Sequence, residues 1–357
     1  METENIQTTP TGFTYLGMNF SDLSINDNSS SAFSDCNSDR SGEFSCASSE
    51  NRRKLWLSCT GTGDDFSEDF IQQLVRGLES SSIDEQKQAA MEIRLLAKNK
   101  PENRVKIAQA GAIKPLISLI NSSDLQLQEY GVTAILNLSL CDENKDHITS
   151  TGAIKPLVRA LRTGTSTAKE NSACALLRLS QLDENKSLIG RSGAIPALVD
   201  LLENGGLRGK KDASTALYTL CSLKENKMRA IGAGIMKPLI ELMADFGANM
   251  VDKSAYVLSL LVTLPEARPA LVEEGGIPVL VELVEVGSHR QKEIAAAILL
   301  QLCEDSGVYR TLVGREGAIP PLVALSQSGT SRARKKAETL IELLRQPRSG
   351  YIAAKDI

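Results

Sequence analysis

One six-residue phrase recurs through most of this chain at a nearly constant interval. It reads Gly-Ala-Ile-Lys-Pro-Leu at residues 111–116 and returns, with small changes, about every 41 residues. Its copies begin at Gly111, Gly152, Gly193, Gly234, Gly275 and Gly317, and only the last is one residue late. A phrase repeated at this period indicates a chain built by stacking similar units, because a globular protein with one core has no reason to repeat.

Each unit predicts three helices, as residues 143–182 illustrate. A short helix should end before Gly152, since glycine readily takes the left-handed conformation that terminates a helix. Pro156 lies in the first turn of a second helix, where the amide groups have no intrahelical partner to lose. A longer third helix is expected over about 167–182. One register of the third helices holds Ala134, Ala175 and Ala216. We therefore expect close helix contacts at these alanines, where a larger side chain would overfill the space.

The repeats divide the chain into three parts. Residues 1–65 are rich in serine and acidic residues without a regular apolar pattern, so they predict a disordered tail. Residues 66–346 predict a solenoid, and residues 347–357 a short C-terminal tail. The expected units lie near 66–99, 102–141, 143–182, 184–223, 225–264, 266–305 and 308–346. The first of them has only two helices. The predicted fold class is all-α.

Composition excludes several classes of protein. The net charge of -4 offers no general attraction to nucleic acid or to an anionic membrane. The seven cysteines form no CxxC pair and no zinc-like spacing. No segment approaches the length of ~20 apolar residues that a membrane span needs, and the N-terminus lacks the pattern of a signal peptide. We expect a monomeric protein of the cytoplasm, the nucleus or both.

The units resemble armadillo repeats, on the glycine-initiated phrase and on Asn-Leu-Ser at residues 137–139. Glu-Asn-Lys recurs at 143–145, 184–186 and 225–227. With this motif the chain is similar to the armadillo region of plant U-box ubiquitin ligases. The segment 36–44 is similar to the segment that precedes the repeats in that group. The resemblance implies a right-handed superhelical solenoid of about six to seven armadillo repeats. No stretch here matches a U-box, so the chain resembles the substrate-binding half of such a ligase.

The sequence predicts no catalytic, metal or cofactor site. The two histidines, His147 and His289, lie in different units, so neither has the neighbours that a metal site or a His-based nucleophile needs. The glycine-rich stretch 205–211 has no preceding strand and the wrong spacing for a phosphate loop. We therefore expect a protein that is not an enzyme.

The resemblance also implies that the third helices line a concave groove that binds a protein or peptide. In peptide-binding armadillo proteins an asparagine column on these helices bonds the backbone of the ligand. The corresponding residues here are Asn137, Arg178, Thr219, Leu260, Gln301 and Glu342. The candidate partner-binding residues are Tyr130, Asn137, Asn171, Arg178, Thr219, Lys253, Tyr256 and Gln301. The alternative is that the tyrosines only pack on neighbouring helices.

Basic residues cluster where the third helices begin, at Lys210–Lys211, at Arg290 with Lys292, and from Arg332 to Lys336. Positive charge at a helix N-terminus opposes the helix dipole. An acidic or phosphorylated ligand, or the acidic tail of the chain itself, would offset it. Ser34, Ser38 and Ser41 in the tail are candidate phosphorylation sites. The alternative is a solvated tail without a role.

We predict a non-catalytic adaptor that binds partner proteins, and the resemblance implies a setting in ubiquitin-linked signalling. One alternative is a component or substrate-recognition subunit of a U-box-type E3 ubiquitin ligase. Another is a nuclear import-type cargo receptor, which the broken asparagine column and the missing tryptophan column disfavour. Nucleic-acid binding would need a net basic face with stacking aromatics, which the sequence does not show.

Overall fold

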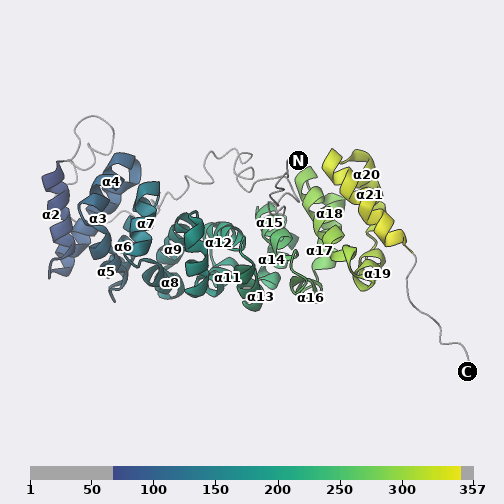
Figure 1. The fold of residues 1–357 in the computed structure, drawn as a ribbon, viewed down its shortest axis with the longest axis horizontal. Coiled ribbons are helices and arrows are strands. Elements are labelled where there is room, and N and C mark those ends of the chain that lie inside the picture. Colours follow the sequence, from purple (N-terminus) through teal and green to yellow (C-terminus); the bar gives the residue numbers. More distant parts are fainter. Residues whose placement is uncertain (1–66, 347–357) are drawn as a thin grey trace, which may run out of the picture. The chain divides into compact units, whose positions relative to one another are not determined.

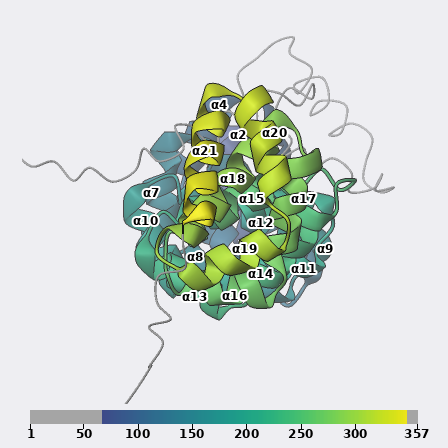
Figure 2. The same cartoon turned by 90° about the vertical axis from the view of Figure 1, so that its right-hand side faces the viewer.

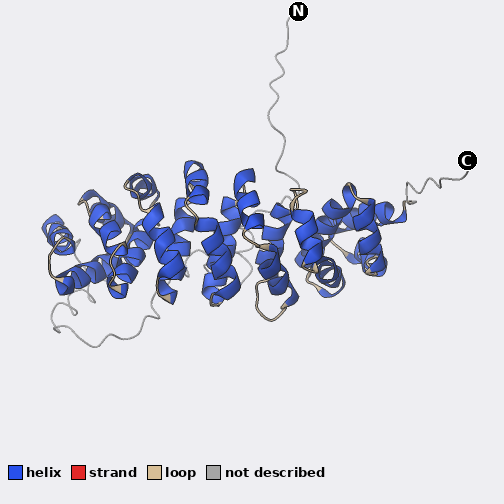
Figure 3. Ribbon diagram, turned by 90° about the horizontal axis from the view of Figure 1, so that it is seen from below, coloured by secondary structure: helices blue, strands red, loops and turns tan. Residues whose placement is uncertain are grey.

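The computed structural model describes residues 67–346, which belong to one compact unit of the chain. The predicted tails and the candidate sites Ser34, Ser38 and Ser41 lie outside the described residues. Between residues 67 and 346 the chain forms twenty helices and no strand (Figure 3). This confirms the predicted all-α fold.

The helices follow one another as triplets in which the third helix is the longest. The first unit has α2 (Glu68–Leu78) and α3 (Ile83–Asn99). The first helices of the other units are α4 (Pro101–Gln109), α7 (Asp142–Ser150), α10 (Asp183–Arg191), α13 (Lys224–Gly232), α16 (Ala267–Glu273) and α19 (Gly307–Arg315). The second helices are α5 (Ile113–Ile120), α8 (Ile154–Thr163), α11 (Ala194–Asn204), α14 (Met236–Ala244), α17 (Gly276–Val286) and α20 (Ile319–Ser328). The third helices are α6 (Leu125–Leu138), α9 (Ser166–Leu179), α12 (Leu207–Leu220), α15 (Val251–Leu261), α18 (His289–Glu304) and α21 (Ser331–Arg345), with α3 in the same position of the first unit.

The units stack in chain order from α2 to α21 (Figure 1). Each third helix packs on the second helix of its own unit and on the third helices of the units before and after it. Seen along the stack, α12, α15 and α18 lie toward the middle, whereas α13, α14 and α16 lie at the periphery (Figure 2). The third helices therefore form one continuous inner row.

Glycine marks each boundary between a first and a second helix. The six glycines that open the repeated phrase have φ between 75° and 91°, a conformation that other residues rarely adopt. In the unit of residues 143–182, the sequence predicted that the third helix ends at about residue 182. The helix, α9, ends at Leu179 instead. Its carbonyl accepts a hydrogen bond from Asn185 Nδ2 at 3.0 Å, so the chain turns there.

The core is continuous, within each unit and between neighbouring units. Leu157, Leu176 and Leu179 are fully buried, and a buried leucine contributes ~1.5–3 kcal/mol. Ala134, Ala175 and Ala216 are also fully buried, as their shared register predicts. Because each unit covers the next, stability is roughly a sum over neighbouring pairs.

The Glu-Asn-Lys motif is a connector between units. Asn144 Nδ2 donates to the carbonyl of Leu138 at the end of α6 and to that of Arg104 in the preceding first helix, both at 3.1 Å. Asn226 Nδ2 donates in the same way to Leu220 O at 2.9 Å and to Lys186 O at 3.0 Å. Each buried amide thus binds a carbonyl at the end of a third helix and ties successive first helices together.

A cation occupies one position of every first helix. These residues are Arg104, Lys145, Lys186, Lys227, Arg268 and Arg310. Arg104 donates to Ala97 O at 2.7 Å and Lys98 O at 2.8 Å, near the end of α3. Arg310 donates to two carbonyls at the end of α18, both at 2.7 Å. Cations at helix C-termini interact favourably with the helix dipole, so these arginines stabilise the third helices.

The fifth unit departs from the pattern. Its third helix, α15, has 11 residues, whereas α6, α9 and α12 have 14 each. Residues 245–250 form a loop in its place, with Asn249 at a φ of 52°. Asparagine tolerates this left-handed conformation better than most residues, and the glycine and asparagine here favour a turn over a helix start.

Candidate functional site: the face of the third helices

Side-chain caps mark the start of most third helices, although α12 and α15 have none. Asp124 accepts from the amides of Gln126 at 2.9 Å and Leu127 at 3.0 Å, and Ser288 forms a complete capping box with Gln291. A Cβ at Gly131, seven residues after the cap of α6, would lie 3.0 Å from Leu116 O of the second helix. The side of the helix opposite Gly131 carries the residues that lie 2, 5, 6, 9, 12 and 13 positions after the cap residue. We call it the third-helix face.

Two of the predicted partner-binding residues join α6 to α3. Asn137 is 2 % exposed, and its Nδ2 donates to the carbonyl of Arg94 at 2.9 Å. Tyr130 is buried, its hydroxyl accepts a hydrogen bond from Gln126, and the Arg94 guanidinium lies 5.2 Å from its ring centre. Burial lowers the pKa of Arg94. These contacts hold two units together.

Asn171 has a similar place between units. It is fully buried, donates to Thr133 Oγ1 of α6 at 2.9 Å and accepts from Arg208 of α12 at 2.8 Å. A single side chain thus links three third helices. An asparagine so engaged contributes chiefly to the stack, because a ligand would have to replace these hydrogen bonds.

Tyr256 is buried at the middle of the face, and burial raises the pKa of its hydroxyl to about 12. Tyr130 and Tyr256 are therefore buried packing residues and not exposed anchors, which agrees with the alternative that the tyrosines pack on neighbouring helices. Tyr218 is not among the predicted partner-binding residues. It is partly exposed, and burial raises its pKa too. It directly precedes Thr219, so a complete list of the outward positions would have included it.

The remaining predicted residues are partly exposed. They are Arg178, Thr219, Lys253 and Gln301. Thr219 Oγ1 donates to Thr215 O of its own helix at 3.0 Å. The last member of the column was placed wrongly. The caps Ser288 and Thr330 lie 42 residues apart, so the residue equivalent to Gln301 is Leu343 and not Glu342.

Carboxylates on the face connect neighbouring units. Thr165, the cap of α9, donates to Glu129 of α6 at 2.6 Å. Thr330 and Lys336 of α21 both contact Glu293 of α18, at 2.8 and 3.1 Å.

Arg208 extends this network through weaker contacts. Its guanidinium lies 3.7 Å from Glu170 and 3.7 Å from Asp212. Most acidic groups of the face therefore already have partners within the protein.

The described residues contain no arrangement of chemical groups that suggests catalysis. No group of three or more His, Cys, Asp or Glu side chains between residues 67 and 346 could hold a metal ion. Burial raises the pKa of the Cys221 and Cys303 thiols to about 12, which disfavours the reactive thiolate. Among the same residues, no helix combines the length and apolar character of a membrane span.

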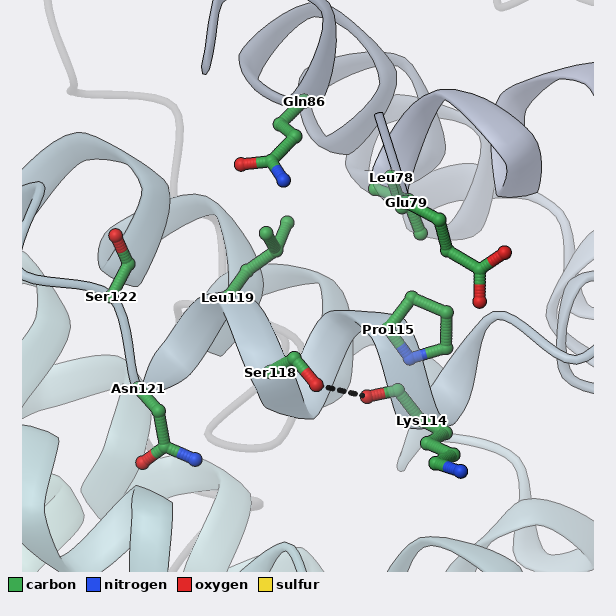
Figure 4. Close-up of a pocket in the computed structure, with 9 residues that line it drawn as sticks. All are labelled: Leu78, Glu79, Gln86, Lys114, Pro115, Ser118, Leu119, Asn121 and Ser122. Carbon is green, nitrogen blue, oxygen red and sulfur yellow. Dashed lines mark hydrogen bonds between the residues drawn. The ribbon is translucent and has the colours of Figure 1, made fainter. Parts of the chain in front are cut away.

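Small clefts lie on another edge of the molecule, where the second helices of adjacent units meet. One of them has a volume of about 480 Å³ and lies between α2, α3 and α5 (Figure 4). Leu119 and Pro115 line it, and Ser118 Oγ donates to Lys114 O at 3.2 Å. Equivalent clefts of about 220 and 280 Å³ lie in two other units, so these spaces follow from the stacking.

Comparison with known proteins assigns the family. The model of the plant U-box protein ARM repeat region matches residues 71–355. The chain belongs to this family. The match confirms the predicted resemblance to the armadillo region of plant U-box proteins.

Individual relatives match shorter stretches. The E3 ubiquitin-protein ligase SPL11 of Oryza sativa subsp. japonica is 52% identical over 73 residues, which cover 20% of this chain and 10% of SPL11. U-box domain-containing protein 13 of Arabidopsis thaliana is 49% identical over 72 residues, or 20% of this chain and 11% of that protein. The chain thus matches only about a tenth of the length of these relatives.

An engineered protein of known crystal structure superposes with a TM-score of 0.67 at 25% identity. The match covers 77% of this chain and 68% of that one.

Proposed function

We propose that this chain is a non-catalytic adaptor that binds an extended segment of a partner protein on its third-helix face. One observation carries the proposal. Partly exposed polar and aromatic side chains recur on the same face of successive units, including Arg178, Tyr218, Thr219 and Gln301. A continuous row of such positions suits a ligand that is itself extended, because an extended chain advances ~3.3 Å per residue and meets several units.

The family supports a setting in ubiquitin-linked signalling. The matched relatives are named as a ubiquitin ligase and as U-box proteins. This chain would supply the recognition surface, as a monomer in the cytoplasm, the nucleus or both.

The test uses a displayed library of random peptides of about 12 residues, long enough to span several units. The double variant Thr219→Trp/Gln301→Trp fills the third-helix face without a change of charge. The matched control, Ser150→Trp/Ser187→Trp, places the same bulk on exposed positions of first helices. We expect peptides that bind the full chain and the control but lose at least tenfold in affinity for the face variant, a difference of about 1.4 kcal/mol. Equal binding to both variants would refute the proposal.

A second candidate is a substrate-recognition subunit of a U-box-type ligase, which the family match favours. It would bring a bound protein to a ubiquitin-conjugating enzyme. The discriminating experiment mixes the full chain with activating and conjugating enzymes, ubiquitin and a fusion protein carrying a selected peptide. Ubiquitin transfer to the fusion that depends on Thr219 and Gln301 would favour this candidate over the plain adaptor.

A further inference from the structure

The seven third helices carry a net positive charge, whereas the rest of the solenoid is net negative. Together they contain 16 lysines and arginines against 11 aspartates and glutamates. The rest of residues 67–346 contains 18 basic and 22 acidic residues. The excess lies in the last four of these helices, with 11 basic and six acidic residues, since the first three have five of each. Positive charge is therefore concentrated in the third helices of the C-terminal half.

Several acidic groups of this region are already engaged. Glu293, 2 % exposed, contacts Thr330 and Lys336, and Asp212 lies near Arg208. By contrast, Lys211, Arg290 and Lys335 form no hydrogen bond or ion pair with another side chain in the part of the chain that the structure describes. Lys335 is exposed, and the other two are partly exposed. These three cations, one in each of α12, α18 and α21, can accept an external anion.

Their register places them on the third-helix face. Lys211 and Lys335 follow the caps Gly206 and Thr330 by five residues, the position that Glu129 and Glu293 hold in other units. Arg290 follows Ser288 by two, the position from which Arg208 reaches back to the preceding third helix. Arg290 also interacts electrostatically with Tyr256 of α15. All three cations thus lie along the inner row.

On this basis we propose that the C-terminal half of the third-helix face, from α12 to α21, binds an extended partner segment rich in aspartate and glutamate. The inference rests on the proposed function and specifies the chemistry of its ligand. Carboxylates suit the site better than a phosphate group, because a phosphate is bound best by several donors converging on one point. Here single cations are spread over separate units. Partly exposed apolar residues between them, Ala297 and Leu300, offer contacts for apolar side chains of the same segment.

The test selects peptides on the full chain from the random library and compares their composition with the unselected library. We expect enrichment in aspartate and glutamate. Charge reversal in Arg290→Glu/Lys335→Glu should weaken the selected peptides roughly tenfold or more, since each exposed ion pair contributes a few-fold and becomes repulsive. The control Lys155→Glu/Lys224→Glu makes the same change of charge on exposed positions of α8 and α13, and should change binding less than twofold.

The outcomes separate this inference from the proposed function. Peptides that depend on Thr219 and Gln301 but show no acidic enrichment, or that bind Arg290→Glu/Lys335→Glu unchanged, would overturn the charge inference alone. A serine-phosphorylated peptide that binds at least tenfold more tightly than its glutamate-substituted counterpart would overturn the choice of carboxylates. A library without any face-dependent peptide would overturn both proposals.

Discussion

Replacing Asn226 by alanine should destabilise the solenoid strongly, although the residue lies outside the third-helix face. Its side chain is fully buried and donates to the carbonyls of Lys186 and Leu220, while its Oδ1 accepts from Arg229 at 2.8 Å. Each intramolecular hydrogen bond contributes ~1 kcal/mol, and each buried group left unpaired costs ~1–3 kcal/mol. Allowing for partial access of water to the vacated space, we expect a loss of ~2–4 kcal/mol.

Urea unfolding followed by far-ultraviolet circular dichroism measures this loss. The control Asn204→Ala removes an amide whose one hydrogen bond, to Asp200, is exposed, so it should change stability by less than ~0.5 kcal/mol. Hydrogen exchange should locate the damage in α10, α12 and α13, the helices that Asn226 joins. A loss below ~1 kcal/mol, or equal losses for both variants, would refute the view that this asparagine connects units.

Four further predictions concern the stack and its ligand. Gly190→Ala should lower the free energy of unfolding by ~1–3 kcal/mol, because the new Cβ would lie 1.9 Å from Asn226 Oδ1. Gly190→Ala combined with Asn226→Ala should lower it by less than the sum of the two single losses. Full additivity in urea unfolding would contradict the contact. Ala175→Leu should cost ~1–3 kcal/mol by overpacking, and an unchanged melting temperature would contradict its place in the core. The pKa of Asp124 is lowered chiefly by its hydrogen bond to Lys87, so the carboxylate stabilises the fold above its unfolded pKa and this stability is lost as the pH falls. Asp124→Asn should therefore melt lower than the unmodified chain at pH ~7, with the gap closing below pH ~4, and a gap independent of pH would exclude this role. A basic peptide of the nuclear-import type should not bind with micromolar affinity, and such binding in a titration would revive the import-receptor alternative.

The repeating architecture could be predicted because its signals are local. Gly152 marks the end of one helix, and Pro156 lies in the first turn of the next. The helices of each unit can therefore be located in the sequence without knowledge of the neighbouring units. The shortened α15 was harder to foresee, because the repeated phrase before it is intact. Only the local run of glycine and asparagine at 247–249 shows that the first turn is missing.

The site was less predictable because exposure on a stacked helix depends on the next helix. Periodicity placed Tyr130, Asn137 and Asn171 on the correct side of their own helices. It could not show that α3 and α12 supply partners that engage Asn137 and Asn171. The sequence also could not show that Lys211, Arg290 and Lys335 lack hydrogen-bonding or ion-pairing side chains among the described residues, because the pairing of charges depends on the register between units.

Site-specific cross-linking tests the central claim most directly. A photoreactive amino acid is placed at Thr219 on the third-helix face or, separately, at Ser187 on a first helix, and a selected peptide is added to the full chain. Because the peptide should lie along the inner row, we expect covalent capture from Thr219 and none above background from Ser187. Capture from Ser187 with none from Thr219 would contradict the account.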